Sequence, residues 1–275
     1  MITLRKIDPS PVVREFVRYY MYRQGGSEGR VVARPIPARP DIFLGFFLLH
    51  SYDAFDYRSG RTETLPSALV VGPQTRHVAD LLLEGPHAEF FVYFEPAGFY
   101  RLFGVSPVEL VNRADDASVV VGPRAGLLLE ELRRATNVEA MVRAVECFLL
   151  AHAASARPFH PVQQAASIVL RNKGRVSLAE LIGASGVGER QFERKFTEQI
   201  GMTPKLYVRV VRLNHALQLK EQRPTLTWTE VSHRAGYFDQ THLVKDFKAL
   251  TGARPSDFMR RFTEAAPEAF LPALS

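Results

Sequence analysis

Two sets of side chains in the C-terminal half combine residue types that can read DNA bases. Arginine can bond guanine, glutamine can bond adenine, a carboxylate can accept from cytosine, and a valine can contact the thymine methyl group. At helical spacing, the members of each set lie on one face of a helix. The candidate base contacts are Arg190, Glu193, Arg194 and Thr197 in the first set, and Gln240, Thr241, Val244 and Lys245 in the second.

Each candidate has a plainer alternative, because polar residues often form no more than a solvated helix face. Phosphates repel Glu193 unless it reads a cytosine, so it could instead orient Arg190 or Arg194, or lie on an ordinary helix surface. A further group of basic residues is expected to contact phosphates or simply to keep the surface soluble. This group comprises Lys205, Arg209, Arg212 and Lys248.

The residues around both sets form an internal repeat, residues 177–204 and 227–255. Each unit starts with a Ser/Thr-x-x-Glu capping box, has a glycine nine residues after the cap, and ends in Gly-x-x-Pro. The glycine permits the left-handed backbone that ends one helix and turns the chain into the next. The second unit has one extra residue after this glycine.

Two such units in tandem, joined by a helix from Pro204 to about Lys220, predict a pair of helix-turn-helix motifs. Their second helices carry the two sets of candidate base contacts. We expect these helices to enter successive major-groove segments about 34 Å apart on one face of the DNA.

The positive charge of the chain is concentrated in the same region. The whole sequence has a net charge of +6, with 35 Lys and Arg against 29 Asp and Glu. Residues 160–265 contain 17 of the basic residues and 10 of the acidic ones. The entire excess therefore lies in the C-terminal part, as expected where a domain meets a polyanion, with nucleic acid as the first candidate.

The N-terminal half has a different pattern. Between about residues 31 and 96, short runs rich in branched and aromatic residues alternate with Gly and Pro, which favours an antiparallel barrel or sandwich. From Gly98 onward the apolar spacing is helical. The stripe between Val138 and Leu149 could pack on its own barrel or on a partner subunit. The predicted strands are 42–49, 68–71, 78–83 and 89–94, with Gly85-Pro86 as a break.

The helix-turn-helix units closely resemble the DNA-binding domain of the AraC/XylS family of bacterial transcription regulators. Residues 235–248 and 251–258 are similar to the family signature, in which G-F-x-D-x-S-H-F-x-R-x-F-K leads to G-x-x-P-x-x-Y/F. Residues 191–196 and 201–204 are similar to the family's other half. The family's base-contacting positions fall on nearly the same residues as the two sets above. The departures are Tyr237 for Phe, Thr241 for Ser, Lys245 for Arg, and Gly188 where a capping Ser or Asp is usual.

The resemblance implies promoter DNA and RNA polymerase as partners. Residues 71–75 and 94–99 are similar to the sensor domain of some family members, which is often a cupin-like barrel that binds an effector, dimerises, or both. This similarity to the sensor domain implies a small-molecule effector and a homodimer. The arginines among the pocket candidates could equally cap loop carbonyl groups. The polar candidates for lining an effector pocket are Arg34, Arg39 and His50, with Tyr22 and Tyr93.

The sequence lacks residues suited to metal binding or to catalysis. The eight histidines include no H-x-H or H-x-x-x-H pair, so neither a metal site nor a cofactor is expected. Cys147 lies in an apolar helical setting and is expected to be a core thiol rather than a nucleophile. No apolar run reaches the length of a membrane span, and the N-terminus lacks the core of a signal peptide. We therefore expect a cytoplasmic protein that is not an enzyme.

These features predict an α+β chain of two domains. Residues 1–155 would form a mainly-β, cupin-like sensor or dimerisation domain with a helical connector, and residues 156–162 a linker. Residues 163–265 would form an all-α tandem helix-turn-helix domain, with a tail at 266–275. The expected function is sequence-specific regulation of transcription, controlled by an effector or a partner through the N-terminal domain. The alternatives are a ligand-binding or enzymatic barrel that uses DNA binding only for autoregulation, and non-specific DNA packaging.

Overall fold

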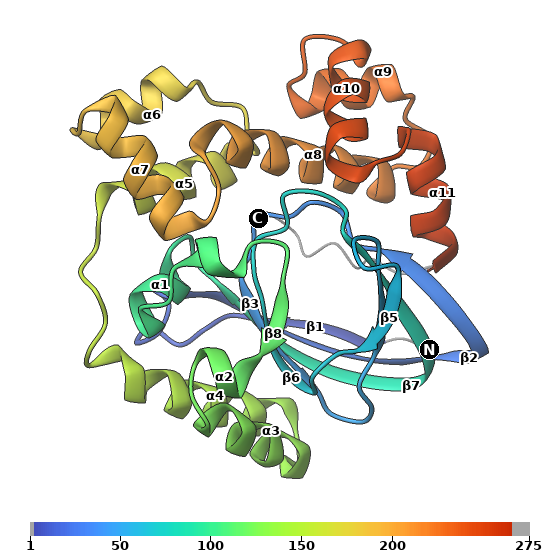
Figure 1. Ribbon diagram of the computed structural model, residues 1–275, viewed down its shortest axis with the longest axis vertical. Coiled ribbons are helices and arrows are strands. Elements are labelled where there is room, and N and C mark those ends of the chain that lie inside the picture. Colours follow the sequence, from blue (N-terminus) through green and yellow to red (C-terminus); the bar gives the residue numbers. More distant parts are fainter. Residues whose placement is uncertain (1–2, 266–275) are drawn as a thin grey trace.

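The computed structural model describes residues 3–265, apart from the side chains of residues 27–30 and of Ala265. The N-terminal part is built on an antiparallel sheet whose main strand order is β1-β2-β7-β3-β6-β8 (Figure 1). β4 and β5 form a hairpin that pairs with β7. The strands are β1 (Thr3–Ile7), β2 (Val17–Pro35), β3 (Phe43–Phe47), β4 (Asp53–Asp56), β5 (Arg61–Thr64), β6 (Ala68–Val71), β7 (Ala79–Phe94) and β8 (Ala114–Asp116).

The sheet extends beyond the predicted strands. β2 begins at Val17, well before residue 31, and β7 is continuous across Gly85-Pro86, so the predicted break there is wrong. β7 continues because β2 pairs with it on both sides of the break, with Gly26 opposite Pro86 and Leu83 opposite Val32. Gly85 adopts a φ of 67°, which absorbs the irregularity where the register shifts.

Both faces of the central strands are buried, which explains their continuous apolar runs. In β3, Leu44 and Phe46 belong to the cluster that packs under the connector helices. The alternating residues Phe43 and Phe47 belong to a second cluster on the inner face of the curled sheet. A strand that is covered on both sides needs apolar residues at every position, so its sequence loses the alternating pattern of a half-exposed strand.

The connector helices pack on the outer face of the sheet. Val145, Phe148 and Leu149 of the predicted stripe are buried against this sheet, so the chain's own β structure covers them. Cys147 lies two positions after Val145, on the opposite side of the helix, and is exposed; the prediction of a core thiol is wrong. The connector comprises α1 (Gly98–Phe103), the 3-10 helix η1 (Pro107–Leu110), α2 (Ala117–Val120), α3 (Arg124–Arg134) and α4 (Val138–Ala153).

We call residues 3–153 the β region and residues 161–265 the helical region. Figure 1 shows α8 running between the two helical units, above the sheet. None of the helices within residues 3–265 is long and apolar enough to cross a membrane. The helical region contains α5 (Pro161–Arg171), α6 (Leu178–Ser185), α7 (Glu189–Ile200), α8 (Pro204–Gln222), α9 (Trp228–Ala235), α10 (Gln240–Thr251) and α11 (Pro255–Ala265).

The repeat folds as its local signals predict. In the second unit, Glu230 N donates to Thr227 Oγ1 at 3.2 Å and Thr227 N donates to Glu230 Oε2 at 2.7 Å, so the capping box is complete. Ser177 and Glu180 form the same box in the first unit. Gly186 and Gly236 have φ values of 67° and 82° and end the first helix of each unit. The predicted fold class, a mainly-β part with a helical connector followed by tandem helix-turn-helix units, is confirmed.

The β region contacts both helical units. At the first unit, Tyr100 Oη donates to Glu198 at 2.9 Å and Ser106 Oγ donates to the Glu198 carbonyl at 3.0 Å. At the second unit, His77 N donates to the Leu250 carbonyl at 2.8 Å, and Arg261 pairs with Asp80 at 2.5 Å. The β region therefore fixes the position of each unit relative to the other.

Two glycines with the same cap role test this contact. Gly201 ends α7 with a φ of 83°, and a Cβ there would lie 2.9 Å from Pro73 and 3.0 Å from Pro107. Gly252 ends α10 with a φ of 73° and faces open space. We expect Gly252→Ala to cost about 1–2 kcal/mol of unfolding free energy, from backbone strain alone. Gly201→Ala should cost more, because the β region must also move, and urea unfolding of both full-length variants measures the difference. Equal losses would contradict a tight contact at Gly201.

Candidate nucleic-acid interface

Helix α7 separates a buried face from a polar one. Phe192, Phe196 and Ile200 enter the core of the helical region, which their three- and four-residue spacing requires. On the opposite side, Arg190 and Glu193 are exposed. The exposed Arg194 and the half-buried Thr197 lie on the same side. The first set of candidate base contacts therefore shares one accessible helix face.

Glu193 has no ion pair with either neighbouring arginine within the described residues. The choice between base reading, an Arg-orienting role and an ordinary helix surface stays a prediction for Glu193. Gly188 caps the start of α7 without a side-chain hydrogen bond, as the sequence predicts. In the second unit, Asp239 accepts from His242 N at 2.7 Å, so α10 begins with a stronger cap.

Helix α10 presents the second set in the same way. Leu243, Phe247 and Leu250 are buried, whereas three of the four candidates, Gln240, Thr241 and Lys245, are exposed. Val244 is half-buried and packs against the core, which leaves less of its surface for a thymine methyl group. Thr229 Oγ1 donates to Gln240 Oε1 at 2.7 Å. This bond positions the glutamine amide while leaving its two N–H donors available.

The four candidate phosphate contacts fall into two groups. Lys205 and Lys248 are exposed and extend into solvent. Arg209 pairs with Asp246 at 2.8 Å and thereby joins α8 to α10. Arg212 donates to the Gly174 carbonyl at 2.8 Å and lies over a tyrosine ring. Both arginines thus hold the fold together, and a phosphate role for all four stays a prediction.

A single long helix joins the two units. α8 has 19 residues, so it is about 28 Å long at 1.5 Å per residue. One turn of B-DNA is about 34 Å. α8 is one uninterrupted helix, buried along most of its length, so it joins the two units rigidly.

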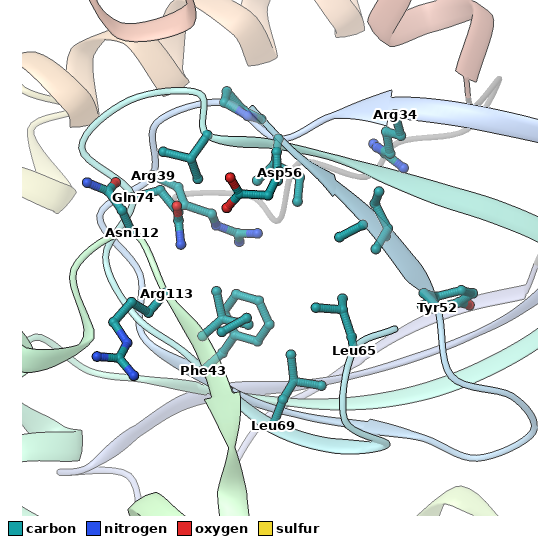
Figure 2. Close-up of a pocket in the computed structure, with 18 of the residues that line it drawn as sticks. Arg34, Arg39, Phe43, Tyr52, Asp56, Leu65, Leu69, Gln74, Asn112 and Arg113 are labelled. Carbon is teal, nitrogen blue, oxygen red and sulfur yellow. The ribbon is translucent and has the colours of Figure 1, made fainter. Parts of the chain in front are cut away.

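The β region encloses a cavity of about 510 Å³ on the inner face of the sheet. Figure 2 shows Arg39 extending into it below Asp56, with Phe43, Leu65 and Leu69 on the opposite wall. The wall combines an aromatic and aliphatic surface with polar and charged side chains, as in sites for small organic ligands.

Three of the five candidate pocket residues, Arg34, Arg39 and Tyr93, line this cavity. His50, which is exposed on the turn after β3, lies outside it, as does Tyr22, which packs against the cluster on the other face of the sheet. The inner wall also carries polar residues that the sequence analysis did not single out. These residues come from separate strands and loops, so no single sequence pattern groups them; the Arg39–Gln74 backbone bridge brings Gln74 beside Arg39. They include Arg23, Tyr52, Asp56, Gln74, Asn112 and Arg113.

Three arginines, Arg23, Arg34 and Arg39, line the buried side of the cavity. Arg23 donates to Glu89 at 2.7 Å and is neutralised by it. Arg34 is 1% exposed, and burial together with the guanidinium groups of Arg23 and Arg39 lowers the pKa of Arg34 well below its usual value. Its guanidinium lies 4.8 Å from the ring of Phe262, which α11 contributes to the cavity wall. An anion placed here would relieve the repulsion among the arginines.

A four-residue segment, 38–41, connects the cavity to the helical region. Ala38 is fully buried in the core cluster of the helical region, and its carbonyl accepts from Asn214 Nδ2 at 2.7 Å. The next residue, Arg39, lies in the cavity wall and donates to Tyr93 Oη at 3.4 Å. One short stretch of chain therefore touches both the cavity and α8.

Asp41 extends this connection through buried ion pairs. Its carboxylate pairs with Arg39 at 3.4 Å and with Arg18. Burial raises the pKa of Asp41, but the two guanidinium groups outweigh burial and hold it below its usual value. Arg18 lines a small gap of about 20 Å³ together with Gln199 of α7 and Tyr207 of α8. The ion pairs thus run from the cavity wall to the surface on which the helical units rest.

Comparison with known proteins gives results for the helical region and for the fold. A family model described as a helix-turn-helix domain matches residues 181–261. The probable transcriptional regulator LumQ of Photobacterium leiognathi is 31% identical over 86 residues, which are 30% of this chain and 34% of LumQ. The chain thus matches about a third of the length of that relative.

Among solved structures, an apo form of ToxT from Vibrio cholerae has a TM-score of 0.50 at 10% identity. The match covers 89% of this chain and 98% of ToxT, so the likeness concerns the fold of nearly the whole chain. The DNA-binding domain of AdpA, solved in complex with a target DNA, has a TM-score of 0.37 at 20% identity. It covers 40% of this chain and all of that domain.

Proposed function

We propose that this chain, a member of the AraC/XylS family through its helix-turn-helix domain, is a transcription regulator that reads promoter DNA with α7 and α10. The observation that carries the proposal is the repeated arrangement of the two helices, each with a buried apolar face and an accessible polar face. We divide the chain as the sequence predicts, with residues 1–155 as the controlling domain, 156–162 as the linker and 163–265 as the DNA-binding domain. Residues 266–275, the predicted tail, lie outside the described residues.

Selection of duplexes from a random pool by the full chain tests the DNA-reading role. We expect a consensus with two short elements about one helical turn apart, one for each unit. Footprinting of the selected duplex should protect one face of the DNA. If selection returned no consensus and all duplexes bound equally, non-specific packaging would replace our proposal.

The cavity in the β region supports control by an organic anion with an apolar body. The anionic group would meet Arg34 and Arg39, and the apolar body would lie against the aromatic and aliphatic wall. We assign the cavity a binding role and no catalysis. Two of its polar groups, Arg23 and Tyr52, are both paired with Glu89.

A series of carboxylates and their uncharged amides tests this ligand class. At a ligand concentration of about 100 Kd, a bound carboxylate should raise the free energy of unfolding by about 2.7 kcal/mol. The matched amide should have a much smaller effect, because the arginines favour the negative charge. Arg34→Gln should abolish the stabilisation, and Arg134→Gln, at an exposed position of α3, should leave it intact. Equal stabilisation by acids and amides would count against an anionic effector.

The ion pairs of segment 38–41 offer a route from effector to DNA-binding domain. An anion drawn to Arg39 competes with Asp41 for the same guanidinium. Asp41 would then pair more strongly with Arg18, at the contact with α7 and α8. The consequence is a change in how the β region holds the two reading helices relative to each other.

Three further parts of the proposal follow from the role at a promoter. A regulator bound there acts on RNA polymerase, by recruiting or by blocking it. The exposed apolar residues Val119 and Leu127, on α2 and α3, support a homodimer through the connector helices. The site of action is the cytoplasm, where promoter DNA is found in bacteria.

A further inference from the structure

Phe238 is the most exposed large apolar residue of the helical region among the described residues, at 88%. It lies in the turn between α9 and α10, directly before Asp239, the N-cap of α10. Nearly all of an aromatic ring therefore faces water at this position, where burial against a partner would be favourable.

The repeat shows that the fold does not need an apolar residue here. A residue directly before an N-cap commonly packs onto the first turns of its helix. In the first unit Val187 has this position and packs against the core. In the second unit Tyr237 packs against the core instead, and it is only 4% exposed. Phe238 then stands outside, because this unit has one residue more than the first between its glycine and its cap.

The turn holds Phe238 in a defined place. Gly236 fixes the end of α9 with a φ of 82°, and Asp239 caps α10 through the amide of His242. Tyr237 packs between the guanidinium of Arg212, 5.4 Å away, and the ring of His242, 5.3 Å away. An anchored residue on each side of Phe238 limits its movement.

The neighbours of Phe238 indicate what it meets. Gln240 and Thr241 follow it within three positions and are candidate base contacts at the start of α10. In helix-turn-helix proteins the N-terminal residues of the reading helix approach the base edges, while the preceding turn lies at the groove's edge. The groove there exposes two apolar surfaces, the thymine methyl groups and the faces of the deoxyribose rings.

We propose that Phe238 is an additional DNA contact, which packs its ring on a thymine methyl group or a deoxyribose as α10 enters the groove. This inference rests on the proposed DNA-reading role and adds a residue that works by burying apolar surface. Such a contact displaces no counterion, so it adds affinity without adding salt dependence.

Binding of Phe238 variants to a duplex selected by the wild-type chain tests the proposal. Phe238→Ala should raise Kd about 5- to 20-fold, and Phe238→Leu should recover part of the loss. The slope of log Kd against log salt should stay unchanged. Phe159→Ala is the matched control, because Phe159 is 59% exposed and lies between α4 and α5, outside both reading helices. Both alanine variants should keep the wild-type melting temperature.

Replacement of single thymines by deoxyuridine distinguishes the two apolar surfaces. If Phe238 contacts a methyl group, one replacement should weaken the wild type and leave Phe238→Ala unaffected. If it contacts deoxyribose, no replacement should affect the two proteins differently, although Phe238→Ala still binds more weakly.

Three results would overturn the proposal. One is a Kd for Phe238→Ala within about twofold of the wild type, and another is a salt slope reduced by about one. The third is normal DNA binding with lost regulation in a transcription assay, which would make Phe238 a contact for a protein. If only this inference fails, Lys245→Ala should still bind the selected duplex more weakly than the wild type. If the proposed function fails, selection should return no preferred duplex.

Discussion

Arg194→Ala combined with Lys245→Ala is expected to weaken binding to the selected duplex by about 2–6 kcal/mol, at about 1–3 kcal/mol for each base contact. The two residues lie on different reading helices, so their effects should be nearly additive. Each is exposed, and neither supports the core. Affinity measurements on the wild type, both single variants and the double variant complete the cycle.

The distribution of the loss across base pairs decides what the residues do. Loss of a base contact should relax discrimination at particular positions in each half of the site, whereas loss of a phosphate contact weakens all sequences alike. Arg143→Ala, which removes an exposed arginine from α4, is the control and should leave binding unchanged. A uniform loss over all duplexes would favour non-specific packaging.

The second large effect is expected at Asp41. Asp41→Asn should lower the free energy of unfolding by about 3–5 kcal/mol, because it leaves the buried guanidinium groups of Arg18 and Arg39 without their counter-charge. Urea unfolding of the full chain measures the loss. Glu139→Gln breaks the exposed pair with Arg5 and should leave stability unchanged.

The pH dependence of the same carboxylate has a definite sign. The pKa of Asp41 is lower in the folded chain than its usual value, because Arg18 and Arg39 outweigh the effect of burial. Its stabilisation is therefore complete above the usual carboxyl pKa of about 3.9 and is lost as the pH falls toward the folded value. Below about pH 4, the free energy of unfolding of the wild type should exceed that of Asp41→Asn by less than it does at neutral pH. A difference between the two proteins that stayed constant down to pH 2 would contradict this assignment.

The helical region could be predicted in detail because its signals are local. Thr227 and Glu230 specify a helix start within four residues, and Gly236 specifies the end. The core face of α10 follows from the spacing of Leu243, Phe247 and Leu250 alone. Nothing outside each unit is needed to define these elements.

The β region depends on distant pairings, which local patterns do not contain. Gly85-Pro86 would end an isolated strand, but pairing with β2 carries β7 across it. Arg39 reaches the cavity wall because it bridges to Gln74, and His50 falls outside because β3 ends at Phe47. The polarity of His50 gave no indication of this, since composition does not reveal on which side of a turn a residue emerges.

The position of Ala38 has a practical consequence for dissecting the molecule. Its methyl group fills a place in the hydrophobic core of the other half of the chain, as does that of Ala97. A truncated product that starts near residue 163 would lack the two alanine methyl groups of this core. The amide of Asn214 would then be open to water. Fragments cut at the linker therefore have an incomplete hydrophobic core. We expect DNA affinities measured on them to describe a less rigid DNA-binding domain than that of the intact protein.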